Sequence, residues 1–578
     1  MKINTKYVVL VVLALFQFCA TAKENKQLTQ HNASLYHGGN IITMEGDSLS
    51  YVDALVEQDG KVVYVGSKQG AEKAYSHART VNLNGKTLMP GFIEPHLHPS
   101  IAALMLPNDT IAPHQWKKPN GISKATKTPE AFKQQLKASI ANAPENKMHF
   151  IWGYHQLWHG ELSRELLNQY AGANKPVGII HRSFHEIYLN DAAIKLFNIV
   201  ENDFANNPQV NWQKGHFYEG GWLALVPKIG SVLLDPVNYQ KGLSMMTELM
   251  LQNGITTIAE PGFPSADFKM EYAFLKSEMD KQPPYDIYLI PNGTQLYGIA
   301  GNSNEKAEKQ MQGLAEAYDT DNIFFLPQQV KLFADGAIYS LAMQMNEPYL
   351  GNEFHGEWMT PLQLFQQQLS FYWNKGYKIH VHANGDKGIQ QVVDFNKADQ
   401  KAHPRENHRF TLHHMGYFDA KIAEQINSLN IEASVNPFYL WALADKYSEN
   451  GLGPQRAENL VRIKELTKRN IPVSFHSDFA MAPAEPLTLA WTAINRVTSE
   501  NSAFSQEQRL DIYTAMKGIT IDAARTLNLE DKIGSIKVGK IANFTILKDN
   551  PFTVDPMTIK DIPVAAVVYK GKWVQNKH

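Results

Sequence analysis

A histidine pair closes an apolar stretch in the first hundred residues. Residues 89–98 read MPGFIEPHLH, so His96 and His98 are separated by a single residue. Side chains at positions i and i+2 of a strand point to the same side, which lets both imidazoles approach one metal ion. An isolated pair of this kind is more often two surface or core histidines, so the metal interpretation depends on partners at the ends of other strands.

Three later stretches end in residues of the same chemical kind. The sequence KIHVHANGD contains His380 and His382, and His382 is nearer the carboxyl end of its strand. In barrels of parallel strands, the active site lies at that end. We therefore expect His382 to be a metal ligand and His380 to lie deeper. In HRFTLHH the adjacent residues His413 and His414 face opposite ways, so both cannot line one site. The sequence VSFHSD ends in Asp478.

Strands that alternate with helices must position these residues, which is the pattern of a parallel α/β fold. Most intervals between the strands are typical of βα units, but 164 residues separate His96 from Glu260. We predict an α/β fold with a TIM (β/α)8 barrel over residues 89–532 and an insertion at about 105–235 that covers its carboxyl face. The candidate strands are 88–94, 256–260, 287–291, 329–333, 378–382, 410–414, 431–436 and 472–477.

The two ends of the chain have a different character. Residues 34–88 contain short β-like runs broken by glycine, and residues 533–577 contain β-rich runs with a turn at Lys570-Gly571. Neither segment alone makes a stable sheet. We predict that both ends together form one small β-sandwich.

The first 22 residues have the pattern of an export signal. Lys2 and Lys6 precede an apolar run, and the sequence ATA at 20–22 supplies a small-x-small cleavage site. The run is too short for a stable membrane anchor, so we expect the mature protein in the periplasm or outside the cell. The only cysteine, Cys19, would be removed with this segment. A mature chain without thiols leaves His, Asp, Glu or a modified Lys to bind a metal ion.

In combination, these motifs resemble the amidohydrolase superfamily. The resemblance rests on the histidine pair after PGFI, on HANGD, on HRF followed by histidine, and on the terminal Ser-Asp pair. The sequence KLFADG at 331–336 resembles more specifically amidohydrolase family 3, the branch that includes N-substituted formamide deformylase. The sequence GSIKVGK at 534–540 resembles the superfamily's return to the sandwich. The resemblance spans about residues 34–575.

The resemblance implies a centre of two divalent metal ions, with Zn²⁺ as the default. It assigns His96, His98 and Asp478 to one ion, His382 and His414 to the other, and Lys331, carboxylated on its amine, to both. A lysine ammonium, with a pKa of about 10.4, would be repelled by two dications, whereas a carbamate supplies two anionic oxygens.

The activity implied is hydrolysis of a non-peptide C–N bond, of the amide or formamide kind, in a small substrate. The metal ions would lower the pKa of a water toward about 7, and Asp478 would take its proton and pass it to the leaving nitrogen. His185, in RSFHE, matches a family position near the site. The candidates for lining an apolar substrate pocket are Trp158, Tyr339, Phe438, Tyr439 and Trp441.

Three positions depart from the family pattern. His413 stands where many relatives have Glu, and Asn543 stands where an Asp is usual in the tail motif. His476 stands where a small residue is common, and at i−2 from Asp478 it shares the inward face. The first and third of these reshape the pocket, and none removes a ligand.

Other functions remain open at this point. The same kind of site hydrolyses lactones, phosphotriesters or cyclic amidines in other barrels, because fold alone does not fix the reaction. A non-enzyme alternative is an exported ligand-binding barrel, against which a complete ligand set with a candidate base argues. The formal charge of −2 and the lack of a basic stripe exclude a nucleic-acid partner. The sequence is compatible with a monomer or a homo-oligomer.

Overall fold

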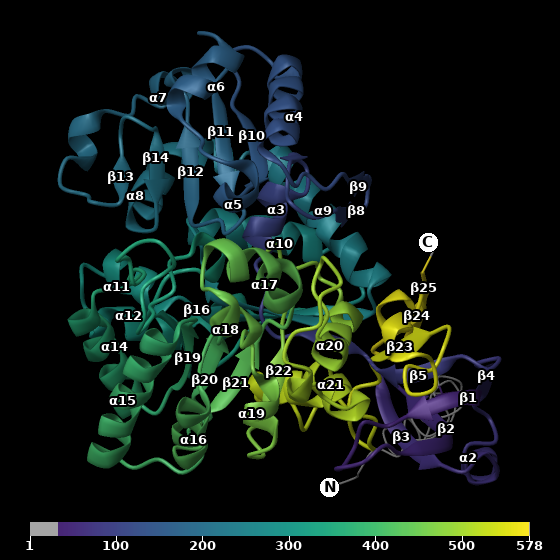
Figure 1. Cartoon of the computed structure of the whole chain (residues 1–578). Coiled ribbons are helices and arrows are strands. Elements are labelled where there is room, and N and C mark those ends of the chain that lie inside the picture. Colours follow the sequence, from purple (N-terminus) through teal and green to yellow (C-terminus); the bar gives the residue numbers. More distant parts are fainter. Residues whose placement is uncertain (1–32, 577–578) are drawn as a thin grey trace, which may run out of the picture.

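Two parallel sheets form the centre of residues 33–576, the part of the chain that the computed structural model describes (Figure 1). The predicted export signal lies outside these residues. One sheet has the strand order β17-β16-β15-β6 and the other β18-β19-β20-β21-β22. Each of the eight predicted strand ranges overlaps one of these strands, and β17 is an additional one. Their bounds are β6 (Phe92–Glu94), β15 (Ile255–Phe263), β16 (Asp286–Pro291), β17 (Ile323–Phe325), β18 (Gln329–Phe333), β19 (Lys378–Ala383), β20 (Thr411–His414), β21 (Glu432–Val435) and β22 (Val473–Phe475).

The first and last of these strands lie side by side at their carboxyl ends. The Asp478 N–H donates to the carbonyl oxygen of His96 over 3.0 Å. The Ser477 N–H donates to the carboxylate of Glu94 over 2.9 Å. At the other junction of the two sheets, an isolated parallel bridge pairs Asn292 with Lys331. The chain segments that carry the candidate ligands are therefore brought together from both sheets.

The glycine of the Pro-Gly pair before β6 is needed because the backbone there lies very close to a neighbouring strand. β5 (Thr87–Pro90) leads into β6 through Gly91. A Cβ atom at Gly91 would lie only 2.1 Å from Oγ1 of Thr256 in β15, so a side chain there would push the strands apart. This glycine therefore sets the packing of the strand that ends in the histidine pair.

The helices cover the sheets with one apolar face. In α14 (Leu362–Asn374) the side chains of Phe365, Leu369 and Tyr372 are buried, at the spacing of a helix that packs on a sheet. The helix is followed by Gly376 at φ +81°, a left-handed conformation that glycine adopts without strain. No helix within residues 33–576 combines the length and the apolar character needed to cross a membrane.

Both ends of the described chain contribute to a further sheet, drawn purple and yellow at the lower right of Figure 1. Hydrogen bonds join its strands into one eight-stranded sheet built from both ends of the chain, and its arrangement as a sandwich stays a prediction. Within the sheet, β1 pairs with β4 along its first half and with β5 after a register shift between His37 and Ile41. The strands are β1 (Ala33–Ile42), β2 (Tyr51–Gln58), β3 (Lys61–Gly66), β4 (Arg79–Asn82), β5, β23 (Phe544–Leu547), β24 (Val564–Tyr569) and β25 (Lys572–Gln575).

The long segment between β6 and β15 forms a lobe of its own, drawn blue at the top of Figure 1. Its six-stranded sheet has the order β13-β14-β12-β11-β10-β7. Its strands are β7 (Asp109–Thr110), β10 (His149–Tyr154), β11 (Val177–His181), β12 (Glu186–Leu189), β13 (Val210–Asn211) and β14 (His216–Tyr218). The lobe has a hydrophobic cluster of its own, which includes Phe132, Leu136 and Val177. The lobe can therefore form a sheet that is separate from the two central sheets.

Candidate metal centre

Three of the predicted ligands form a compact triangle, called here the His–His–Asp triangle: His96, His98 and Asp478. The Nε2 atoms of the two histidines are 3.3 Å apart. Oδ1 of Asp478 lies 3.2 Å from Nε2 of His98 and 3.5 Å from Nε2 of His96. Ligand atoms about 2.05 Å from a tetrahedral metal ion are about 3.3 Å from one another. The three separations therefore fit a single ion without rearrangement.

The second oxygen of Asp478 faces another histidine. Oδ2 lies 3.6 Å from Nδ1 of His414, which is also 3.2 Å from the hydroxyl of Tyr439. The ring of His382 lies beside that of His414, with centroids 4.2 Å apart. Asp478 thus stands between the triangle and the two histidines predicted for a second ion. Burial holds the pKa of His382 and of His414 well below the ordinary value, so both are neutral imidazoles that can donate a lone pair.

Lys331 is buried in the same place without a hydrogen-bond partner for its amine among the described residues. Burial lowers the pKa of this amine to about 7, although the charge of Asp478 acts in the opposite direction. Its own charge lowers the pKa of His96, His382 and His414, which places the amine close to the ligands of both predicted ions. All six predicted ligands are therefore gathered into one buried cluster.

Behind His96, a chain of hydrogen bonds fixes which nitrogen carries its proton. Nε2 of Gln329 donates to the Leu527 carbonyl, so Oε1 of Gln329 accepts from Nε2 of His380 at 2.8 Å. Nδ1 of His380 must then accept from Nε2 of His413 at 2.8 Å. Nδ1 of His413 accepts in turn from Nδ1 of His96 at 2.9 Å. This order, assigned from the network, leaves the lone pair of His96 Nε2 free to face the other two corners of the triangle.

His413 and His414 take different places around His96. The ring centroids of both lie 4.8 Å from that of His96, but His413 is hydrogen-bonded behind that ring, whereas His414 faces Asp478. His414 ends its strand with a φ of +77°, outside the β region. The expectation that both cannot line one site is compatible with these positions. The deeper position expected for His380 agrees with its contacts to Gln329 and His413.

The insertion lobe contributes an oriented histidine to the site. Nδ1 of His185 lies 2.8 Å from a carboxylate oxygen of Glu219, and its ring centroid is 6.1 Å from that of His382. Burial alone would lower the pKa of His185, but the charge and hydrogen bond of Glu219 raise it. Glu219 also lines a cavity of about 270 Å³, together with Glu186, Tyr188 and Tyr218. The residues that line this cavity include neither His185 nor any of the six predicted ligands.

Two of the other predicted substrate residues, Tyr339 and Trp158, make packing contacts. The hydroxyl of Tyr339 donates to the Met481 carbonyl at 2.7 Å, and its ring lies against the guanidinium of Arg182. Trp158 is buried in the insertion lobe, with its ring centroid 4.6 Å from that of His155. Tyr439 reaches the site, because its hydroxyl lies 3.2 Å from Nδ1 of His414. Substrate binding by these residues stays a prediction.

Several positioning residues were missed from the sequence. Arg182 donates to the carbonyls of Ala480 and Met481, both over 2.6 Å, and so ties the insertion lobe to the segment after Asp478. Glu260 lies 3.7 Å from Nδ1 of His98. Of these residues, only Gln329 could have been found from the sequence. It lies at i−2 from Lys331, so both side chains point to the inward face of the strand.

The donor set fits the metal ions that such a site would hold. The amine of Lys331 and Nε2 of His414 are buried without a partner, and buried polar atoms are rarely left so. The triangle has the ligand separations of a tetrahedral ion, and its imidazole and carboxylate groups suit Zn²⁺ and similar divalent ions. Buried imidazoles and an aspartate at the carboxyl ends of parallel strands define a candidate metal-dependent hydrolase site.

Comparisons with known proteins identify the family. A model of the amidohydrolase family matches residues 79–575, and the chain belongs to that family, as the sequence motifs predicted. The chain is 24% identical to protein LONG AFTER FAR-RED 3 of Arabidopsis thaliana, over 89% of this chain and 87% of the relative. It is 20% identical to N-substituted formamide deformylase of Arthrobacter pascens, over 94% and 98% of the two chains.

A solved structure shows the same fold. An uncharacterized metal-dependent hydrolase from Pyrococcus horikoshii OT3 superposes with a TM-score of 0.68 at 21% sequence identity. The match covers 91% of this chain and 99% of that one. The α/β amidohydrolase-type fold is thereby confirmed over nearly the whole chain.

Proposed function

We propose that this protein is a two-metal amidohydrolase that cleaves a non-peptide C–N bond in a small substrate. The observation that carries the proposal is the position of Asp478. One of its carboxylate oxygens completes the His–His–Asp triangle, and the other faces His414 beside His382. A carboxylate so placed can serve two ions and also reach a water between them.

A closed barrel is the framework of this proposal. The bridge between Asn292 and Lys331 joins the two parallel sheets on one side. The hydrogen bond from Asp478 to His96 joins them on the other. With the strands of both sheets closed into a barrel at these junctions, the predicted ligands would project from the carboxyl ends, where barrel enzymes place their chemistry.

Lys331 is proposed to bridge the two ions as a carbamate. Its pKa of about 7 leaves a large share of the amine uncharged near neutral pH, and only the uncharged amine reacts with CO₂. The amine is buried without a partner in the midst of the candidate ligands. A carbamate there would replace a buried cation with an anion that two dications attract.

In the proposed reaction, Asp478 transfers the proton and His185 binds the substrate. When bound, divalent ions supply Lewis acidity, which acidifies water and polarises the substrate carbonyl. Asp478 accepts a proton from the attacking water and then donates it to the leaving nitrogen as the C–N bond breaks. His185, oriented by Glu219, stands beside His382, and its protonated form, which Glu219 favours by raising its pKa, can donate a hydrogen bond to the substrate. The hydrogen-bonded chain behind His96 keeps that ligand in one tautomer.

An amide or formamide is the proposed bond class, in keeping with the similarity to N-substituted formamide deformylase. The experiment is a metal analysis of the purified protein, followed by a screen of N-acyl, N-formyl, lactone and phosphotriester substrates. The proposal expects two metal ions per chain and turnover of N-acyl or N-formyl compounds that a chelator abolishes. Turnover confined to lactones or phosphotriesters would overturn the assignment of the bond while leaving the site intact.

Export is proposed from the sequence of the first 22 residues. Cleavage after the ATA sequence would release a mature chain that begins near Lys23. N-terminal sequencing of protein isolated from the native source tests this directly. A native chain that still begins at Met1 would contradict export by this route.

A further inference from the structure

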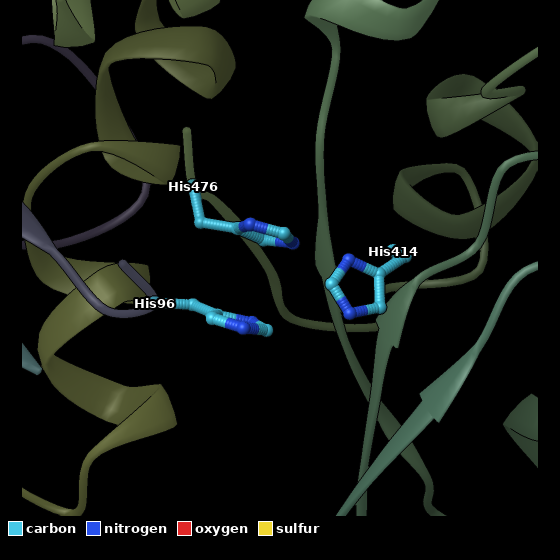
Figure 2. A group of neighbouring side chains, drawn as sticks. All are labelled: His96, His414 and His476. Atoms are coloured by element: carbon cyan, nitrogen blue, oxygen red, sulfur yellow. The ribbon is translucent and has the colours of Figure 1, made fainter. Parts of the chain in front are cut away.

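A small cavity lies between the insertion lobe and the segment that follows β18, and its volume is about 270 Å³. Residues of β12 and β14 line it from the lobe, and residues of the 340–357 segment complete the lining. Figure 2 shows His96, His414 and His476 at the metal centre, and none of these three lines the cavity. The cavity is therefore a second candidate binding site, separate from the metal centre.

The lining of this cavity is acidic. It has four carboxylates and, among the described residues, a single lysine or arginine: Glu161, Glu186, Glu219, Glu357 and Lys214. Nζ of Lys214 donates to Glu161 over 2.9 Å, where both side chains are exposed. The lining thus leaves no lysine or arginine to pair with Glu219 and Glu357.

Glu219 has a carboxylate oxygen that calls for a ligand. Oε2 lies 2.8 Å from Nδ1 of His185, but Oε1 is buried without a hydrogen-bond partner among the described residues, and only 3% of Glu219 is exposed. Burial raises the pKa of Glu357, and the negative charge of Glu219 raises it further, so the two carboxylates are close. Gln209 lies between them: its Nε2 donates to Glu357 over 3.2 Å, and its Oε1 accepts from the Gly220 N–H over 2.8 Å. A cation bound here would relieve the repulsion between the two carboxylates.

Aromatic rings supply much of the remaining lining. The ring of His216 lies between those of Tyr188 and Tyr218, with centroids 4.1 Å and 4.9 Å away. Nε2 of His216 donates to Glu186 over 2.7 Å, so this wall of the cavity is fixed by stacking and by a hydrogen bond. Phe354 also lines the cavity. Ring surfaces suit the carbon part of a ligand, so the cavity matches an organic cation better than a hydrated metal ion.

We propose that this cavity binds a small organic cation, an alkylammonium or guanidinium group that pairs with Glu219 and Glu357. The inference goes beyond the proposed hydrolysis, because the residues of the cavity define the site by themselves. Glu219 connects the two, since its other oxygen orients His185 beside His382. The cation has two possible sources, the charged end of the substrate or a separate amine, and both present the same N–H groups.

Calorimetric titration of the purified protein with benzylamine, a cation at neutral pH, tests the site without any variant. Benzyl alcohol is the neutral probe of similar size. Benzylamine should bind about tenfold or more tightly than benzyl alcohol, because hydrogen bonds between charged partners are the stronger kind. Equal affinities for the two probes, or no binding of benzylamine at millimolar concentration, would overturn the inference.

Two variants locate the binding. Glu219→Gln and Glu357→Gln each remove one charge and keep the shape, and each should weaken benzylamine binding about tenfold or more. Glu353→Gln is the matched control, because Glu353 lies on the same segment as Glu357 but is exposed and does not line the cavity. Wild-type affinity in both folded variants, or an equal loss in the control, would contradict the site.

Kinetics distinguish the two sources of the cation. If the cation is the end of the substrate, N-formyl substrates with an ammonium group should have a KM about tenfold or more below that of uncharged analogues, and Glu357→Gln should remove the difference. If it is a separate amine, benzylamine should bind without competing with an uncharged substrate. Competition that Glu357→Gln leaves unchanged would place the amine at the metal centre and overturn the inference. The calorimetric result needs no hydrolysis, so failure of the proposed function is seen separately.

Discussion

Nδ1 of His96 lies 2.9 Å from Nδ1 of His413, so one of these two nitrogens must carry a proton and the other must not. The chain that continues through His380 to Gln329 settles the choice in favour of a proton on His96. A ligand whose tautomer is fixed in this way presents its other nitrogen to the metal without reorganisation.

The first prediction concerns the far end of that chain. Gln329→Met removes the acceptor for His380 and lets the protons of the three histidines shift. Losing such a partner of a ligand typically lowers metal affinity about 10–100-fold. Gln368→Met is the control, since Gln368 is equally buried but lies outside the chain. Equilibrium dialysis with Zn²⁺ measures the effect, and equal affinities for the two variants would show that the chain has no influence on His96.

The second prediction concerns the bridging lysine. Lys331→Met should lose at least one metal ion per chain and most activity, because no other group supplies the carbamate oxygens. Lys378→Met is a matched control: Lys378 is also buried, its pKa is lowered to about 8 by burial, and it contacts Asn528 instead of the site. Metal analysis distinguishes the two. Adding a short carboxylic acid to Lys331→Ala should partly restore metal and turnover, and two retained ions with normal turnover would contradict the bridge.

The third prediction concerns the pH dependence of stability. Burial raises the pKa of Glu94 to about 8, whereas an exposed glutamate titrates near about 4.3. Between these values the folded protein holds a proton that the unfolded chain has lost, so the free energy of unfolding falls as the pH rises. Glu94→Gln cannot titrate and should lose less stability from pH 5 to pH 8 than wild type.

Urea denaturation in the presence of a chelator measures this difference. Glu145→Gln, at an exposed position, should keep the wild-type pH dependence. If Glu94→Gln shows the same loss from pH 5 to pH 8 as wild type, Glu94 does not hold the proton assigned to it.

Much of the fold could be predicted from sequence because buried parallel strands have near-continuous apolar runs. Four predicted ligands directly follow or end such runs, so the sequence indicates their position at strand ends: His96, His98, His382 and Asp478. The positive φ of His414 had no such signal in the sequence.

Partners from distant parts of the chain could not be predicted. Glu219 reaches His185 because β12 pairs with β14 within the insertion lobe, and Arg182 reaches Met481 because the lobe lies against the segment after Asp478. Such contacts depend on tertiary packing, and the intervening sequence has no periodicity that encodes it. The division of β1 between β4 and β5 could likewise not be predicted, because it depends on a register shift.

The central claim is that Asp478 is both a metal ligand and the group that moves the proton. Asp478→Asn keeps the shape and one oxygen ligand, and His96 and His98 still hold the ion, so metal content should stay near the wild-type value. General base catalysis contributes about 10²–10⁴-fold, so kcat for the N-acyl or N-formyl substrate should fall by that factor while KM changes little. Metal analysis and kcat measured on the same sample of Asp478→Asn test this most directly. Full metal with a 10²–10⁴-fold lower kcat is the result predicted, and full metal with a near-normal kcat would contradict the account.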